Sequence, residues 1–305
     1  MAAPWKPYAC VTPAKGVTGT CTVLSSVHHV THTDAALRIL GDSKITRGLI
    51  YDESVLNDSR TTVVWLSPNT WYDGSRYGSV QFTFDFTDIV AGKKIYWVEV
   101  RKYKRHAYRF IISDQDLKKL PVTAYDATSE EGPLRYDKGV WFWNSEHTAE
   151  FLLDASILLH QCKKVDFIKH HAMFCALPGG CNDLGSDGES AAGRVMAYVL
   201  SRGLRVIDRP LIETTPKKAV STAATRGISS LCAGLDAESG KLSGPLKADT
   251  NVDAALRAAM LQLAAGDGQL ARETAKLIGS DELLKKRLAA LVRGHFGFES
   301  SVLKV

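Results

Sequence analysis

The sequence VHHVTHTDAALRIL (27–40) contains the transition that decides the fold. Its first five residues include Val27, Val30 and Thr31, β-branched residues that favour a β-strand, although three histidines within residues 28–32 are unusual for a plain strand. Asp34 then opens a helical pattern in which Leu37 and Leu40 share one face, and Gly41 is a helix-ending residue. The stretch therefore predicts a strand that leads directly into a helix.

Further strands are predicted on the C-terminal side of this stretch. Runs rich in β-branched and aromatic residues occur at 61–67, 79–86, 94–100 and 108–113, separated by turn-forming residues. All six tryptophans lie before residue 144, whereas alanine and leucine dominate the end of the chain. The sequence therefore predicts an α+β protein with a strand-rich first part and a helical C-terminal extension.

The second half of the chain contains two stretches with irregular composition. Residues 178–192 carry many turn formers and predict a loop or linker, and residues 214–250 are rich in Ser, Thr, Gly and Lys. Apolar stripes with capping residues return beyond residue 250 and predict helices. We therefore expect a catalytic or binding domain over 1–180, a loop-rich connection over 181–250 and a helical region over 251–305.

Composition sets limits on location and partners. The 305 residues contain 45% hydrophobic and 23% charged residues, with a net charge of +5, which weakly favours an anionic partner. No apolar run reaches the length of a membrane span, and the first residues do not form a secretory signal. The six cysteines have no disulfide-scaffold spacing. These features predict a cytoplasmic protein with no membrane partner.

The common cofactor motifs are missing from the sequence. There is no strand–GxGxxG–helix unit, HExxH or GxSxG. Histidines and cysteines cluster between residues 160 and 181. They are His160, Cys162, His170, His171, Cys175 and Cys181, and four such side chains could together hold a zinc ion. Their spacing is irregular, so buried core cysteines and a surface histidine pair are the favoured interpretation, and no metal is expected.

Three motifs occur in an order that resembles a known family. Residues 27–40 are followed by VVWLSPNTWYDGSRYGSVQF (63–82), a strand, loop and tyrosine, and then by WFWNSEHTAEFLLD (141–154). Over about residues 24–170 this arrangement resembles the NAD-dependent ADP-ribosyltransferases, most closely the DarT-like branch that modifies nucleic acid. The resemblance implies an ADP-ribosyltransferase-like split β-sheet core.

The resemblance also implies roles for individual residues. His29 and Thr31 match positions that bind the nicotinamide amide and its ribose, and Tyr77 matches the aromatic residue that stacks on the nicotinamide, with Trp65 as a second wall. Glu150 matches the glutamate that binds the ribose 2′-hydroxyl. NAD would thus be the substrate, with Glu150, His29 and Tyr77 as catalytic residues.

The chain departs from the family pattern at three places. Ser75 lies one residue too close to the stacking tyrosine, and Glu146 does not form the second half of an acidic pair with Glu150. The DarT-like branch has a functional arginine near the second strand, for which Arg60 is the only residue we can offer.

Simpler structural interpretations exist for the same residues. Glu150 shares an i, i+4, i+8 pattern with Glu146 and Asp154, which is compatible with one solvated helix face. The continuous apolar run that follows Glu150 favours a strand instead. His29 is also compatible with a buried core histidine, and Tyr77 with an aromatic residue at the start of a strand.

Residues 93–109, KKIYWVEVRKYKRHAYR, combine seven lysines and arginines with interleaved aromatics and a single acid. Basic side chains contact phosphates and aromatics stack on unpaired bases, so this segment predicts a nucleic-acid-binding surface. Its central residues are Lys102, Tyr103, Lys104 and Arg105. A solvated, charged hairpin is the alternative.

Together, these features predict transfer of ADP-ribose from NAD to a base in DNA or RNA. The family resemblance further implies a toxin or antiviral effector with an antitoxin or regulatory protein as partner. Two alternatives stay open: transfer to a protein side chain, and a non-catalytic module that binds RNA or a partner.

Overall fold

The structure is a computed structural model with an α+β fold, as the sequence predicts. It describes residues 21–50, 56, 59–69, 71, 74–98, 107–128, 133–144, 148–171, 174–176, 186–201 and 204–208. The chain divides into two compact units. Unit 1 consists of Met1–His29, Lys44–Thr70 and Thr83–Gln161, and unit 2 of Val30–Ser43, Trp71–Phe82 and Cys162–Val305.

Unit 1 contains most of the described strands. They are β1 (Cys21–Val23), β3 (Lys44–Ile45), β4 (Gly48–Leu49), β5 (Thr62–Leu66), β7 (Lys94–Val98), β8 (Ala107–Ser113), β9 (Thr123–Tyr125), β10 (Leu134–Asp137), β11 (Val140–Asn144), β12 (Thr148–Leu153) and β13 (Ile157–Leu158). Among the described residues, the short helices α3 (Phe86–Val90) and η1 (Leu159–Gln161, a 3-10 helix) accompany them. The boundary between the units falls within β2 (Ser26–Thr31) and β6 (Val80–Asp85). The strands predicted at 61–67, 79–86, 94–100 and 108–113 are confirmed as β5 to β8.

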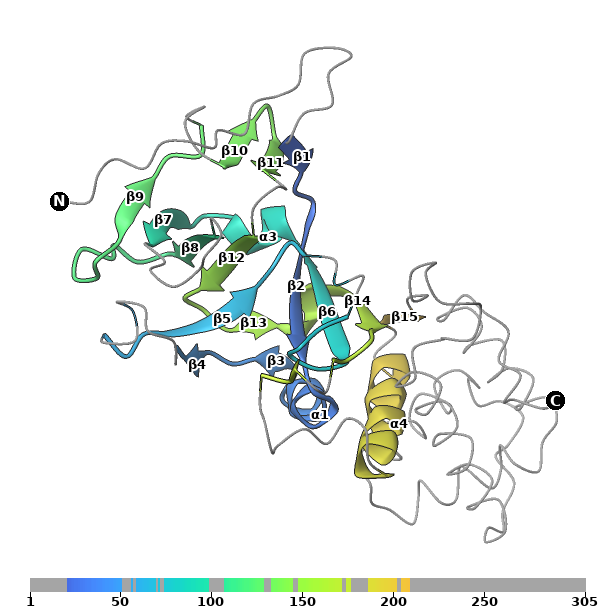
Figure 1. Cartoon of the computed structure of the whole chain (residues 1–305). Helices are drawn as coiled ribbons and strands as arrows, with labels where there is room; N and C mark the ends of the chain where they lie inside the picture. The colour runs from blue at the N-terminus through green and yellow to red at the C-terminus, as the bar shows by residue number, and fades with distance from the viewer. Residues whose placement is uncertain are drawn as a thin grey trace, which may run out of the picture. The chain divides into compact units, whose positions relative to one another are not determined.

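A six-stranded sheet in the order β4-β5-β12-β8-β7-β9 forms the centre of unit 1 (Figure 1). Strand β12 runs parallel to β8 and antiparallel to β5. Alternate residues of each strand point to opposite faces, so paired residues share a face. One face carries an apolar cluster of Ile50, Leu56, Val63, Tyr96, Ile111 and Leu152, with Trp65 packed against it. On the other face the rings of Phe110 and Phe151 stack, and Phe86 of α3 lies 4.9 Å from Phe151 between ring centroids.

Unit 2 contains α1 (Thr33–Asp42), β14 (Cys162–Phe167), α4 (Ser186–Ser201) and β15 (Arg205–Asp208). Strands β15, β14, β6 and β2 follow one another in a four-stranded sheet. The strand-to-helix transition predicted at 27–40 is confirmed as β2 and α1. The helix extends through Gly41 and ends at Asp42, because Ser43 takes the left-handed conformation (φ 59°) and its backbone N–H donates to the carbonyl of Ile39.

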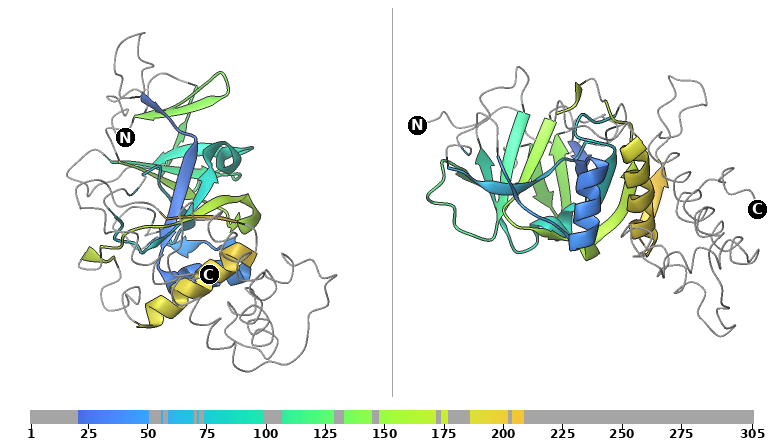
Figure 2. Two further views of the ribbon diagram at one scale, coloured as in Figure 1. Left: turned by 90° about the vertical axis from the view of Figure 1, so that its right-hand side faces the viewer. Right: turned by 90° about the horizontal axis from the view of Figure 1, so that it is seen from below.

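Helix α4 occupies part of a segment that was predicted to be a loop. It lies within residues 181–250 and overlaps the stretch 178–192, both of which were expected to be loop-rich, and β15 follows it. Its buried side chains include Val195, Met196 and Val199, and α4 packs beside α1 (Figure 2). This apolar face stabilises a helix despite the turn-forming residues that precede it. The predicted helical region 251–305 lies outside the described residues.

Gly78 allows two backbone segments of unit 2 to approach closely. Its φ is +132°, a conformation that side-chain-bearing residues rarely adopt. A Cβ atom at this position would lie 2.2 Å from the carbonyl carbon and oxygen of Thr31. Only glycine fits here, beside Thr31 and directly after Tyr77.

We expect Gly78→Ala to lower the free energy of unfolding by about 2 kcal/mol or more, because it combines backbone strain with overpacking. Gly41→Ala is the matched control: it lies in α1 with open space around the added Cβ, so it should stabilise the protein by up to about 1 kcal/mol. Urea denaturation measures the free energy of unfolding of both variants. A Gly78→Ala variant as stable as wild type would contradict the close approach of Gly78 to the backbone of Thr31.

Candidate functional site

Glu150 lies on a strand and not on a helix. It belongs to β12, so the alternative of one helix face shared with Glu146 and Asp154 is wrong. In the parallel pairing of β12 with β8, Glu150 is the direct partner of Arg109. Their side chains therefore point to the same face of the sheet, the face that carries the apolar cluster.

Arg109 and Glu150 form a largely buried ion pair. Nε and Nη2 of Arg109 donate to Oε2 of Glu150 over 2.9 and 2.7 Å. The exposed fractions of the two side chains are 2% and 14%. Removing charges from water is costly, so such a pair persists only where hydrogen bonds and neighbours offset that cost.

Trp65 supplies a second partner for the arginine. Its strand β5 pairs with β12 so that Trp65 lies opposite Leu152, on the same face as Glu150. The guanidinium carbon of Arg109 lies 4.8 Å from the centroid of the Trp65 ring, within the range of a cation–π interaction. Arg109 is thus held by a carboxylate and by an indole ring together.

His29 joins this group through the backbone of Trp65. Strand β2 is attached to the end of β5 by backbone bonds of 2.8 and 2.9 Å between His28 and Ser67. His29 Nδ1 lies 3.0 Å from the carbonyl oxygen of Trp65, and since a carbonyl only accepts, Nδ1 donates. Burial lowers the pKa of His29, partly offset by this hydrogen bond. The ring is then neutral at pH 7, with Nε2 as a hydrogen-bond acceptor.

We use the name Glu150 cluster for four residues of unit 1: His29, Trp65, Arg109 and Glu150. The cluster contains a carboxylate whose orientation Arg109 fixes, an indole ring that the same arginine contacts, and an imidazole hydrogen-bonded to the backbone of Trp65. A fixed carboxylate stabilises positive charge that develops nearby or accepts a proton from a hydroxyl group. The cluster is therefore chemically suited to a reaction with a cationic transition state.

The other two residues that were predicted to bind NAD, Thr31 and Tyr77, lie in unit 2. Tyr77 is 42% exposed, and its ring meets Trp71 edge to face with centroids 5.6 Å apart. Its backbone N–H donates to Oγ of Ser75, and the guanidinium of Arg76 lies 6.0 Å from its ring. Thr31 is half-buried and its backbone contacts Gly78. Thr31 and Tyr77 are thus brought near each other within this unit.

Sequence reasoning missed Arg109. The arginine offered for the NAD site was Arg60, which is exposed in a turn with φ 49°, whereas Arg109 was counted only among the basic residues of 93–109. Arg109 stands within YRFIIS (108–113), a run that otherwise reads as a buried strand. An arginine inside such a run is the signal that predicts a buried ionic partner.

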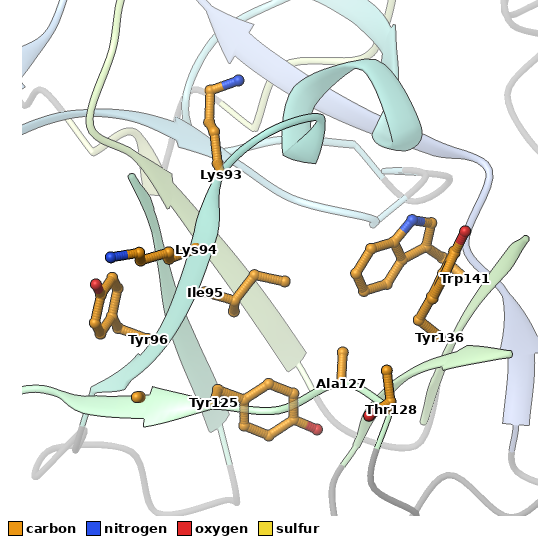
Figure 3. A pocket seen from close by; sticks show the side chains of 10 residues that line it. Lys93, Lys94, Ile95, Tyr96, Tyr125, Ala127, Thr128, Tyr136 and Trp141 are labelled. Carbon is orange, nitrogen blue, oxygen red and sulfur yellow. The ribbon is translucent and has the colours of Figure 1, made fainter. Parts of the chain in front are cut away.

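The predicted nucleic-acid-binding residues Lys102, Tyr103, Lys104 and Arg105 lie outside the described residues. The described start of that segment lines a pocket of about 330 Å³ together with β9, β10 and β11. Figure 3 shows Ile95 and Trp141 facing the hollow, whereas the amino groups of Lys93 and Lys94 point away from it. The hollow is therefore mainly apolar, and no residue of the Glu150 cluster lines it.

Comparisons with protein families, curated proteins and solved structures found no match to this chain. Among the residues that the structure describes, no helix has the length and apolar character needed to cross a membrane.

We expect Arg109→Met to destabilise the protein by about 3–5 kcal/mol, because it leaves the Glu150 carboxylate buried without its partner. The double variant Arg109→Met, Glu150→Leu should recover most of this loss. Arg38→Met removes the exposed pair with Asp34 and should change stability by at most about 0.5 kcal/mol. Urea denaturation provides the comparison, and equal effects of the two arginine substitutions would show that the Arg109 pair is not a buried one.

Acidification tests the environment of His29. Its lowered pKa means that the folded protein binds fewer protons than the unfolded chain below about pH 6.5, so the free energy of unfolding should fall as pH decreases through that value. This loss between pH 7.5 and 5 should be smaller in His29→Gln. The exposed His160→Gln serves as control and should behave like wild type. Identical pH dependence in all three proteins would contradict burial of His29.

Proposed function

We propose that this protein is an NAD-dependent mono-ADP-ribosyltransferase that transfers ADP-ribose to a base of a nucleic acid. The observation that carries the proposal is the Glu150 cluster: Glu150 stands on a strand and is oriented by Arg109, whose guanidinium lies over the Trp65 ring, and His29 hydrogen-bonds the backbone carbonyl of Trp65. Three of these four residues are the ones that the family resemblance assigns to NAD.

The proposed reaction breaks the bond between the nicotinamide nitrogen and C1′ of the ribose. The bonding electrons leave with nicotinamide as a neutral molecule, so no strong acid is required. The ribose becomes an oxocarbenium ion, which a nitrogen or oxygen of the target base attacks. Glu150 accepts a hydrogen bond from the ribose 2′-hydroxyl, stabilises the positive charge and receives the proton that the base loses.

The other residues of the Glu150 cluster have supporting roles in this proposal. Arg109 orients the Glu150 carboxylate and does not contact NAD. Nε2 of His29 accepts a hydrogen bond from the nicotinamide amide or its ribose, and Trp65 provides an apolar wall. Thr31 and Tyr77 enter the proposal through the family resemblance, and the exposed ring of Tyr77 is compatible with stacking on nicotinamide.

The nucleic-acid target is supported by the composition of residues 93–109 and by the net charge of +5. The alternatives are transfer to a protein side chain and a non-catalytic binding module. In this proposal the protein acts as a toxin or antiviral effector, and an antitoxin or regulatory protein controls it.

Replacing Glu150 by glutamine tests the enzymatic part of the proposal. Glu150→Gln keeps the shape of the side chain but removes the charge, so transfer and NAD hydrolysis should fall by about 100-fold or more while NAD binding changes little. Asp154→Asn is the matched control, since Asp154 follows the same strand and pairs with Arg47. Its activity should stay near that of wild type.

Activity of Glu150→Gln within about threefold of wild type would remove Glu150 from the reaction. Wild-type protein that binds RNA without hydrolysing NAD would favour the non-catalytic module. The melting temperature of each variant shows whether a loss of activity comes from the active site or from failure to fold.

Salt dependence tests the nature of the target. For a single strand, the slope of log K against log salt is about −0.7 per phosphate contact, so Lys102→Ala with Lys104→Ala should flatten it by up to about 1.4. The exposed pair Lys118→Ala with Lys119→Ala is the control and should leave the slope unchanged. NAD hydrolysis should be unaffected in both. A transfer reaction that does not depend on salt would favour a protein target.

A further inference from the structure

Two histidines and a cysteine from separate segments of unit 2 converge outside the Glu150 cluster. The ligand atoms of His32, His170 and Cys175 all lie within 4.8 Å of one another. Nε2 of His32 is 3.2 Å from Sγ of Cys175, and the rings of His32 and His170 meet edge to face with centroids 4.9 Å apart. His170 and Cys175 belong to the irregular His/Cys group of the sequence, and His32 is the member that sequence spacing did not reveal.

Backbone hydrogen bonds fix these three positions. His32 lies between β2 and α1, is 4% exposed, and its carbonyl accepts the N–H of Ala36 in the first turn of the helix. His170 forms an isolated bridge with Ser75, and His171 N–H donates to the Ser75 carbonyl. Ala176 N–H donates to the carbonyl of Arg76, which places Cys175. The three side chains therefore meet because the backbone around each of them is held in place.

Two other members of the sequence group, His160 and Cys162, are not among the converging residues. His160 is exposed on η1 in unit 1. Cys162 is buried, and its Sγ lies 3.2 Å from the carbonyl oxygen of Lys164. Cys181 lies outside the described residues. His160 and Cys162 consequently serve as matched controls for the converging residues.

We propose that His32, His170 and Cys175 bind a Zn²⁺ ion, with a water molecule or another exogenous ligand in the fourth position. Two imidazole nitrogens and one thiolate form a donor set that zinc prefers. With metal–ligand bonds of about 2.0–2.3 Å, tetrahedral coordination requires ligand atoms about 3.3–3.7 Å apart. Small side-chain rotations bring atoms that now lie within 4.8 Å to those separations.

Zinc binding replaces the contact between His32 and Cys175. The Cys175 thiol loses its proton to solvent on binding, and the neutral imidazoles donate their lone pairs to the metal. The ion would connect the start of α1 to the 170–176 segment. It would therefore raise the stability of unit 2, a consequence that holds whether or not the protein transfers ADP-ribose.

Metal content and spectroscopy of the full-length protein test this proposal. Purified protein is stripped with a chelator, dialysed and titrated with Zn²⁺ or Co²⁺. We expect one Zn²⁺ per chain by elemental analysis, a higher melting temperature with zinc, and a sulfur-to-cobalt charge-transfer band that reports a thiolate ligand. Zinc should also protect Cys175 from alkylation, as mapped by mass spectrometry.

Variants identify the ligands. Cys175→Ser should abolish the charge-transfer band, and both Cys175→Ser and His170→Ala should weaken zinc binding by about 100-fold or more. Cys162→Ser and His160→Ala should bind like wild type. Wild-type protein with no charge-transfer band and no zinc protection of Cys175 would overturn the proposal, and these two readouts decide it even if a variant fails to fold. Unchanged affinity in a folded Cys175→Ser protein would overturn it as well.

Discussion

The buried ion pair between Arg109 and Glu150 is the interaction on which this account depends. It exists because β8 and β12 run in parallel with these two residues directly paired, so that both side chains point to one face. That face is otherwise apolar, and two charges there are costly unless neighbours offset the cost. The ring of Trp65 and two hydrogen bonds supply that compensation. An apolar pair often fills such a position at lower cost, and we propose that the carboxylate is present for its chemistry.

Strands and the first helix could be predicted from the sequence because their patterns are local. The apolar run after Glu150 indicated a strand, and the strand β12 confirms it. Arg109 was missed because its partner is far away in the sequence, and only pairing of β8 with β12 brings the two together. Helix α4 was missed because glycines and serines dominate its surroundings, while its apolar face packs on α1. Tertiary contacts thus determine the structure of these segments, which local composition alone does not predict.

The predicted site residues fall into two groups. His29, Trp65 and Glu150 belong to the Glu150 cluster of unit 1, and Thr31 and Tyr77 lie near each other in unit 2. The chain passes from one unit to the other between His29 and Val30. The stretch 27–40 therefore supplies three kinds of residue: a histidine of the Glu150 cluster, a threonine beside Gly78, and a ligand of the proposed zinc site. Its density of histidines, unusual for a plain strand, has a separate physical reason at His29 and at His32.

A labelling experiment tests the central claim most directly. The purified protein is incubated with NAD that is radiolabelled in its adenylate phosphate and with separate pools of single-stranded DNA, RNA and protein. The account predicts label that stays with one nucleic-acid pool, is removed by the matching nuclease and is accompanied by release of nicotinamide. Label that is confined to the protein pool would contradict the nucleic-acid target. No label in any pool and no released nicotinamide would contradict the assignment as a transferase.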